Sequence, residues 1–115
     1  MTERRTIIFV SNDGEAALRT AGSCALSAAA MGDRVDVFIF GKALAVVVAT
    51  QADPEVEAAL LHQARGAGNC RLFGCSASLV AEKVDPGAAD RALDAIIGWP
   101  TILEWSRGVV DRYFF

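Results

Sequence analysis

The sequence has no hydrophobic run long enough to cross a membrane. Its most apolar stretch, Ala43 to Ala49, is far shorter than the roughly 20 residues that a membrane helix needs. Met1 to Arg5 also lack the apolar stretch and cleavage site of a signal peptide. With 11 Lys and Arg against 14 Asp and Glu, the net charge of -3 favours neither nucleic acid nor anionic lipid as a partner. We therefore expect a cytoplasmic protein that binds neither.

Motifs for cofactors are missing as well. No strand is followed by Gly-x-Gly-x-x-Gly or by the P-loop pattern, so nucleotide binding has no support. There is no Cys-x-x-Cys pair, and the only histidine, His62, falls in an expected amphipathic helix as a surface or boundary residue without further metal ligands nearby. We expect no metal and no organic cofactor.

The chain is rich in apolar residues, which make up 53% of its 115 positions, while charged residues make up 22%. This length fits a single domain over residues 1–115. The high apolar fraction indicates additional buried surface between subunits. Tyr113, Phe114 and Phe115 close the sequence with three aromatic residues, a type enriched at subunit contacts, so we expect a homo-oligomer. The alternative is that these rings cover the core of their own subunit.

Strand and helix patterns alternate along the chain. Continuous runs of β-branched and aromatic residues predict strands that are buried on both faces, and Pro, Gly and Asp mark where the helices begin and end. The expected strands are Thr6–Val10, Arg34–Phe40, Asn69–Phe73, Leu93–Ile97 and Val109–Phe115. The expected helices are Glu15–Met31, Ala43–Ala49 (where three valines leave a strand open), Pro54 to Gly66, Ala77–Lys83 and Pro100–Arg107, with a turn at Asp85-Pro86-Gly87. This order predicts an α/β fold, a three-layer α/β/α sandwich around a mostly parallel sheet of about five strands.

Ligands of open parallel sheets bind beyond the carboxyl ends of the strands, and two loops there carry polar groups. The first loop contains Asn12 and Asp13. One interpretation is that they cap the following helix; the other is that the loop and the free backbone amides at the start of that helix bind a small anion. The second loop contains Cys75 at a corner between strand and helix.

Cys75 is the cysteine best placed for chemistry. The positive end of a helix dipole favours the thiolate, which is the reactive form of the group. Gly74 leaves room beside the sulfur, and Ser76 and Ser78 carry hydroxyls that could hydrogen-bond to it. The alternative is a buried and inert cysteine.

The other two cysteines have simpler interpretations. Cys24 lies on the alanine-rich face of the first helix, where packing explains it. Cys70 begins the strand that leads to Cys75, and five extended residues span about 16 Å, which is too far for a disulfide without a bend. We expect three reduced thiols.

Four segments together resemble the DsrE/DsrF/DsrH-like family of small sulfur-relay proteins, some of which are labelled peroxiredoxin-like. They are the Asn12-Asp13 loop before an alanine-rich helix, Arg34-Val-Asp-Val-Phe-Ile-Phe-Gly41, Phe73-Gly-Cys-Ser-Ala-Ser78 and Gly98-Trp-Pro-Thr-Ile-Leu-Glu-Trp105. The resemblance covers nearly the whole chain. A peroxidase is not supported, because Leu72 and Gly68 stand where a peroxidatic cysteine is preceded by Thr or Ser and by Pro.

The resemblance implies a sulfurtransferase-like protein. In the family's sulfur carriers a cysteine after the third strand accepts sulfur as a persulfide, and Cys75 matches that position. It further implies a trimer or hexamer, with sulfur donor and acceptor proteins as partners. The alternative function is a non-catalytic oligomeric protein that holds a small anionic ligand in the cleft at the strand ends, near Asn12 and Cys75.

Overall fold

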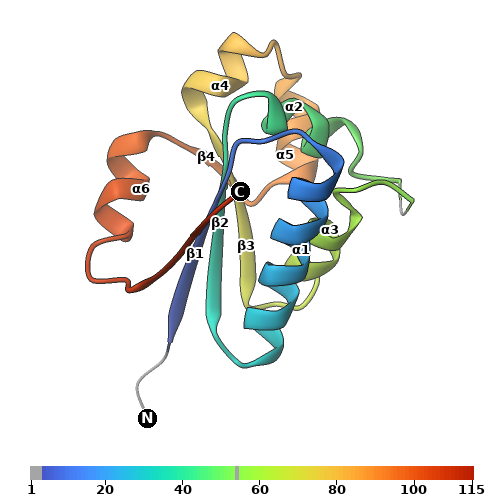
Figure 1. Ribbon diagram of the computed structural model, residues 1–115. Coiled ribbons are helices and arrows are strands. Elements are labelled where there is room, and N and C mark those ends of the chain that lie inside the picture. The colour runs from blue at the N-terminus through green and yellow to red at the C-terminus, as the bar shows by residue number, and fades with distance from the viewer. Residues whose placement is uncertain (1–3, 54) are drawn as a thin grey trace.

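The computed structural model in Figure 1 describes residues 4–53 and 55–115 and contains one five-stranded parallel sheet. The strand order is β4-β3-β2-β1-β5, so β1 and β2, the strands with the most β-branched and aromatic residues, lie inside the sheet. Asp36 pairs with Ile7 on one side and with Arg71 on the other, which fixes the register of the three central strands. The strands are β1 (Arg5–Val10), β2 (Arg34–Ile39), β3 (Cys70–Cys75), β4 (Ala95–Ile97) and β5 (Asp111–Phe114).

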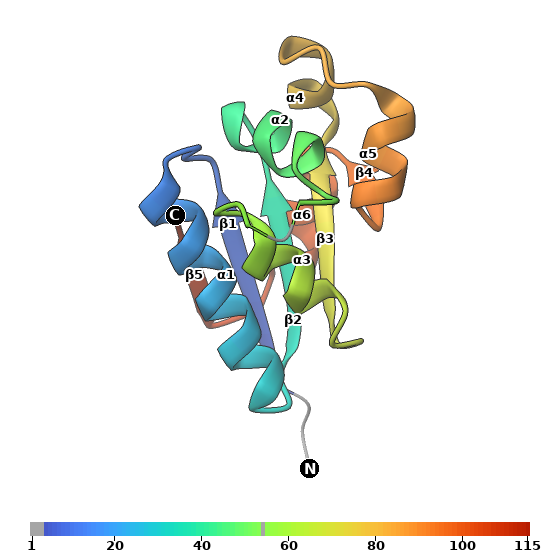
Figure 2. The same cartoon turned by 90° about the vertical axis from the view of Figure 1, so that its right-hand side faces the viewer.

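The helices are divided unequally between the two faces of the sheet. Figure 2 looks onto the face that is covered by α1, α2, α3 and α5, while Figure 1 shows α6 alone on the opposite side. The helices are α1 (Glu15–Ala30), α2 (Lys42–Ala49), α3 (Ala59–Arg65), α4 (Ser76–Ala81), α5 (Pro86–Ala92) and α6 (Trp99–Trp105). In the part of the chain that the structure describes, no helix is both long and apolar enough to cross a membrane.

Alternation along the strands produces two hydrophobic clusters. Residues such as Ile8, Val37 and Leu72 point toward the four-helix face and form the larger cluster with α1, α2, α3 and α5. Residues one position away point toward α6 and form a smaller cluster. The buried members of this second cluster are Ile7, Phe9, Phe38, Phe73, Cys75, Ile102 and Val109.

The predicted α/β sandwich is confirmed, and so is the helix at Ala43–Ala49, which the structure places at Lys42–Ala49. Three details of the prediction are wrong. Helix α3 begins at Ala59, later than expected, and Pro54 lies outside the described residues. A helix, α5, follows Asp85 where only a turn was expected, because the Asp85 side chain accepts a hydrogen bond from the Ala88 amide and caps it. Strand β3 continues through Cys75 and does not stop at Phe73.

The start of α1 also differs from expectation. Gly14 is the capping residue, and no side chain caps the helix. The Asn12 side chain instead accepts a hydrogen bond from the Gly14 amide at 2.7 Å, which closes a tight local turn before the helix begins. Asp13 is exposed.

Candidate functional site

Cys75 is the last residue of β3 and directly precedes α4. Its register partner is Ile97 of β4. Because side chains alternate along a strand, Cys75 projects to the same face as Phe73 and Arg71, toward α6. The side chain is only 2% exposed. The sequence left open whether this thiol is accessible or buried, and in this conformation of a single chain it is buried.

Helix α6 covers this region of the sheet and is anchored at both ends by tryptophan. The ring of Trp99 stacks on Phe9, with ring centres 6.2 Å apart, and meets Phe38 edge to face at 5.0 Å. The ring of Trp105 meets Phe73 edge to face at 5.2 Å. Between them, Ile102 is fully buried in the same cluster as Cys75. The thiol therefore belongs to the hydrophobic cluster that α6 covers.

The neighbours of Cys75 in sequence do not contact its sulfur in the way the sequence suggested. The Ser78 hydroxyl accepts a hydrogen bond from the Gly41 amide at 2.8 Å, so it joins α4 to the loop after β2. Ser76 is exposed, and neither serine hydrogen-bonds to Cys75 within the described ranges. A Cβ on Gly74 would meet Leu93 at 2.8 Å and Ile96 at 2.9 Å on the opposite face of the sheet. Gly74 thus makes room for core packing, not for approach to the sulfur.

The Asn12–Asp13 loop lies at the same edge of the sheet as Cys75, two strands away. The amides of Ser11 and Asn12 both donate to the carbonyl oxygen of Phe115, at 2.9 and 3.4 Å. The Asn12 side chain is held by the Gly14 amide. The amides of Ser11, Asn12 and Gly14 are therefore engaged within the chain itself.

The other two thiols are poor nucleophiles. Burial raises the pKa of the Cys70 thiol to about 12, and the carboxylates of Asp36 and Asp94 act in the same direction. Burial also raises the pKa of Cys24. Cys70 projects to the face opposite to that of Cys75, so no disulfide joins them, and all three cysteines are free thiols. Among the described residues, no three His, Cys, Asp or Glu side chains gather in a metal-binding arrangement.

A family model for the DsrE/DsrF-like family matches residues 5–107, which is most of the chain. The chain belongs to the DsrE/DsrF-like family. The matched region includes all of the sheet except β5 and contains Cys75 and the whole of α6.

Two solved structures share the fold at low sequence identity. The ychN protein from E. coli has a TM-score of 0.75 and 14% identity, with 99% of this chain and 100% of that chain covered. A protein of unknown function from Methanobacterium thermoautotrophicum, MTH1491, has a TM-score of 0.71 and 17% identity, with 96% of this chain and 97% of that chain covered. No curated protein sequence matches the chain. The likeness supports the architecture of this DsrE/DsrF-like chain over its whole length.

One feature of the site, the cover that α6 forms over it, was missed in the sequence. The covering role of Trp99 and Ile102 depends on how α6 folds back onto strands distant in sequence. The Gly98-Trp-Pro segment was noted only for its resemblance, although a tryptophan at the start of a helix is a signal that could have indicated packing against the sheet.

Proposed function

We propose that this chain takes part in sulfur relay and carries a sulfane sulfur as a persulfide on Cys75. Family membership supports the class of function. The position of Cys75 at the carboxyl end of β3, the edge of a parallel sheet at which reactive groups collect, supports the residue. The single observation that carries the assignment to this thiol is its position directly before α4, whereas Cys70 lies at the opposite, amino end of the same strand.

The proposed step is an exchange between sulfur atoms. The Cys75 thiolate attacks the outer sulfur of a donor persulfide, a new S–S bond forms on Cys75, and the donor's own S–S bond breaks to release the donor as a thiolate. Passing the sulfur to an acceptor thiolate repeats the exchange, with Cys75 as the leaving group. No electrons are gained or lost overall, and no metal or organic cofactor is required.

Burial of the thiol means that relay needs a second conformation. Only the seven-residue α6 supplies helical residues to the cluster around Cys75, whereas four helices pack on the other face. Segments with few buried contacts open more easily than the rest of a fold. We therefore assign access to a local opening of α6 between Gly98 and Gly108, the two glycines that flank it.

The experiment is exposure of the reduced protein to polysulfide, followed by intact and peptide mass spectrometry. The expected result is one added sulfur atom on the peptide that contains Cys75 and no addition in Cys75→Ser. Cys24→Ser and Cys70→Ser serve as matched controls and should accept sulfur like the parent protein. Addition that persists in Cys75→Ser, or no addition to the parent protein, would contradict the proposal.

The alternative function, a non-catalytic oligomeric protein that binds a small anion near Asn12 and Cys75, has less support. The amides of Ser11 and Asn12 would have to exchange the Phe115 carbonyl for the ligand. Saturable movement of the Asn12 amide signal in an NMR titration with a small anion, together with no sulfur addition to Cys75, would favour this alternative.

We also propose that the protein forms a homo-oligomer, a trimer or hexamer, in the cytoplasm, and exchanges sulfur with donor and acceptor proteins. Phe114 is 70% exposed although it stacks on Phe9 with ring centres 4.8 Å apart, and Val110, just before β5, is also exposed. Exposed apolar side chains of this kind are covered at subunit contacts. Light scattering coupled to gel filtration tests this, and a monomer at all concentrations would contradict it.

A further inference from the structure

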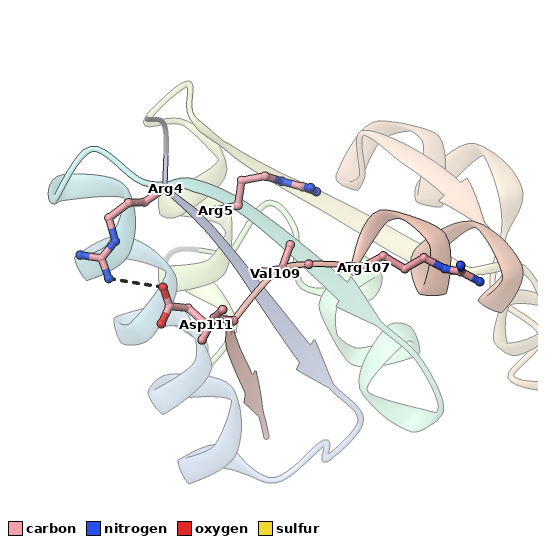
Figure 3. Close-up of a pocket in the computed structure, with 7 residues that line it drawn as sticks. Arg4, Arg5, Arg107, Val109 and Asp111 are labelled. Atoms are coloured by element: carbon pink, nitrogen blue, oxygen red, sulfur yellow. Dashed lines mark hydrogen bonds and ion pairs between the residues drawn. The ribbon is translucent and has the colours of Figure 1, made fainter. Parts of the chain in front are cut away.

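A hollow lined by arginine lies at the amino ends of the strands, at the edge of the sheet opposite to Cys75. It has a volume of about 270 Å³ and lies between the start of β1 and the segment that connects α6 to β5. Figure 3 shows Arg5 on the strand and Arg107 at the end of α6, with Val109 nearby in the segment that follows α6; the Arg107 side chain extends away from Arg5, so it must turn to meet a ligand in the hollow. The lining residues with charged side chains are Arg4, Arg5, Arg107 and Asp111.

A second hollow continues the basic surface. It has a volume of about 320 Å³ and is lined by Arg34 and Arg71 together with Gly68 and Asn69. Five of the eleven Lys and Arg residues of the chain therefore line two hollows, and Asp111 is the one carboxylate among the residues that line them. These five side chains are opposite in charge to the chain's net -3, and four of them already pair with Asp36, Glu104 or Asp111.

The existing ion pairs leave donors available in the first hollow. Arg107 pairs with Glu104 at 3.0 Å, but both side chains are well exposed, and such pairs contribute little free energy. Arg5 is 3.5 Å from Asp36, a carboxylate that it shares with Arg71. A guanidinium has five N–H donors, so both arginines keep unused donors that can turn toward a ligand.

We propose that the first hollow binds a small tetrahedral oxyanion, of the sulfate or phosphate type, between the guanidinium groups of Arg5 and Arg107. Two guanidinium forks match the oxygen geometry of such an anion. Val109, which is buried, lines the hollow and supplies part of its apolar wall. The site lies at the far edge of the sheet from the thiol, so it does not depend on sulfur relay.

The test is an NMR titration of the full chain with inorganic sulfate and, separately, with inorganic phosphate, with chloride at matched ionic strength as the reference. Saturable movement of the amide signals of Arg5, Arg107 and Val109 is expected with sulfate or phosphate and not with chloride. The tighter of the two anions identifies the ligand class. Equal, non-saturating changes with all three anions would overturn the proposal.

Matched variants connect the binding to one side chain. Arg107→Gln should weaken binding by roughly five- to tenfold, because it removes a charge-assisted contact at little cost to the fold. Arg107→Lys keeps the charge but loses the two-pronged guanidinium geometry, so its affinity for the anion should lie between those of the parent protein and Arg107→Gln. Arg19 is also an exposed arginine in an ion pair, with Glu15 at 2.8 Å on α1, so Arg19→Gln is the control and should bind like the parent protein.

Two results with these proteins would contradict the site. One is unchanged affinity in Arg107→Gln, and the other is an equal loss in Arg19→Gln, which would indicate general screening of charge. A hexaglutamate peptide can be titrated in the same way. If it shifts the same amide signals and binds more tightly than either inorganic anion, the hollow binds an acidic protein segment and the proposed ligand is wrong.

Discussion

Arg71 and Asp36 lie directly opposite each other on β3 and β2, and Nε of Arg71 donates to Oδ1 of Asp36 at 3.1 Å. The Asp36 side chain is 2% exposed, and Arg5 approaches its other oxygen. The Arg71 guanidinium also lies 5.0 Å from the ring centre of Phe73 and 5.7 Å from that of Trp105. One side chain therefore neutralises a buried charge on the sheet and contacts the helix that covers Cys75.

Removal of both arginines should destabilise the protein more than removal of the carboxylate. In the double variant Arg5→Met and Arg71→Met, Asp36 is left as an uncompensated buried charge, which costs about 3–5 kcal/mol. In Asp36→Asn the two arginines lose their partner, but they are about one-third exposed and regain water, so about 1–2 kcal/mol is expected. Urea denaturation measures both free energies of unfolding. The reverse order would show that Asp36 is not effectively buried.

Strands β1 and β2 were predictable because almost all of their side chains are buried, on both faces of the sheet, whereas the less buried β4 and β5 begin two residues later than expected. Thr6–Val10 and Arg34–Phe40 are continuous β-branched and aromatic runs, and they correspond to β1 and β2 within one residue at each end. Helix α5 was missed because Pro86 and Gly87 suggested a turn. The same residues also begin a helix when an aspartate precedes them, as Asp85 does here.

The candidate site was only partly predictable. The chain position of Cys75 follows from local patterns, but its burial depends on α6, which begins 24 residues later and folds back over the sheet (Figure 1). Which face a strand residue occupies depends on register, and a shift of one residue reverses it. For the same reason the grouping of Arg5, Arg34 and Arg71 at one edge is apparent only when the three strands are aligned.

Loosening α6 should expose the Cys75 thiol. Ile102 is fully buried beneath the helix, and Ile102→Ala is expected to cost about 2–4 kcal/mol and to speed the alkylation of Cys75 in native conditions. Alkylation is measured by peptide mass spectrometry after timed exposure to iodoacetamide.

The same helix provides the control for this experiment. Leu103 is 56% exposed, so Leu103→Ala should change stability by less than about 0.5 kcal/mol and leave the alkylation rate unchanged. If the parent protein reacts at Cys75 as fast as a short peptide does, the thiol is not covered in solution. If Ile102→Ala reacts no faster than Leu103→Ala, α6 does not control access.

The close contact between α1 and α3 depends on Gly22. A Cβ at this position would lie 2.5 Å from the Leu60 Cβ and 2.9 Å from the backbone nitrogen of Leu61. Alanine in a helix is favoured over glycine by about 1 kcal/mol, but the two helices would have to separate, so Gly22→Ala should destabilise the protein by about 1–2 kcal/mol. In Gly87→Ala the nearest atom is the Asp85 oxygen that caps α5, at 3.3 Å, so only a small shift is needed and the helical preference of alanine offsets it; a change within about 0.5 kcal/mol is expected. Thermal denaturation measures the stability of both variants against the parent protein. If Gly22→Ala is more stable than the parent protein, α1 and α3 are not packed as closely as the structure shows.

His62 should make the fold less stable in mild acid. Its Nε2 lies 3.0 Å from the carbonyl oxygen of Val47, and burial, with a smaller contribution from Arg65, lowers the pKa of the ring below 6.5. At a pH just below 6.5, His62 is therefore protonated in the unfolded chain but still largely neutral in the folded protein. The stabilising contribution of neutral His62 is complete above pH 6.5 and is lost as the pH falls from there toward the lower pKa of the folded state.

Because His62 is the only histidine, a comparison with His62→Gln isolates this effect. Glutamine does not titrate, and its amide can donate to the Val47 carbonyl in place of the ring. The difference in unfolding free energy between the two proteins should be constant above neutral pH. Below pH 6.5 the parent protein should lose stability relative to His62→Gln. The loss in its free energy of unfolding is at most about 1.4 kcal/mol per pH unit, because one proton is involved. If the parent protein instead gains stability relative to His62→Gln as the pH falls, the ring accepts a proton more easily in the fold than out of it, and hydrogen bonding to Val47 outweighs burial.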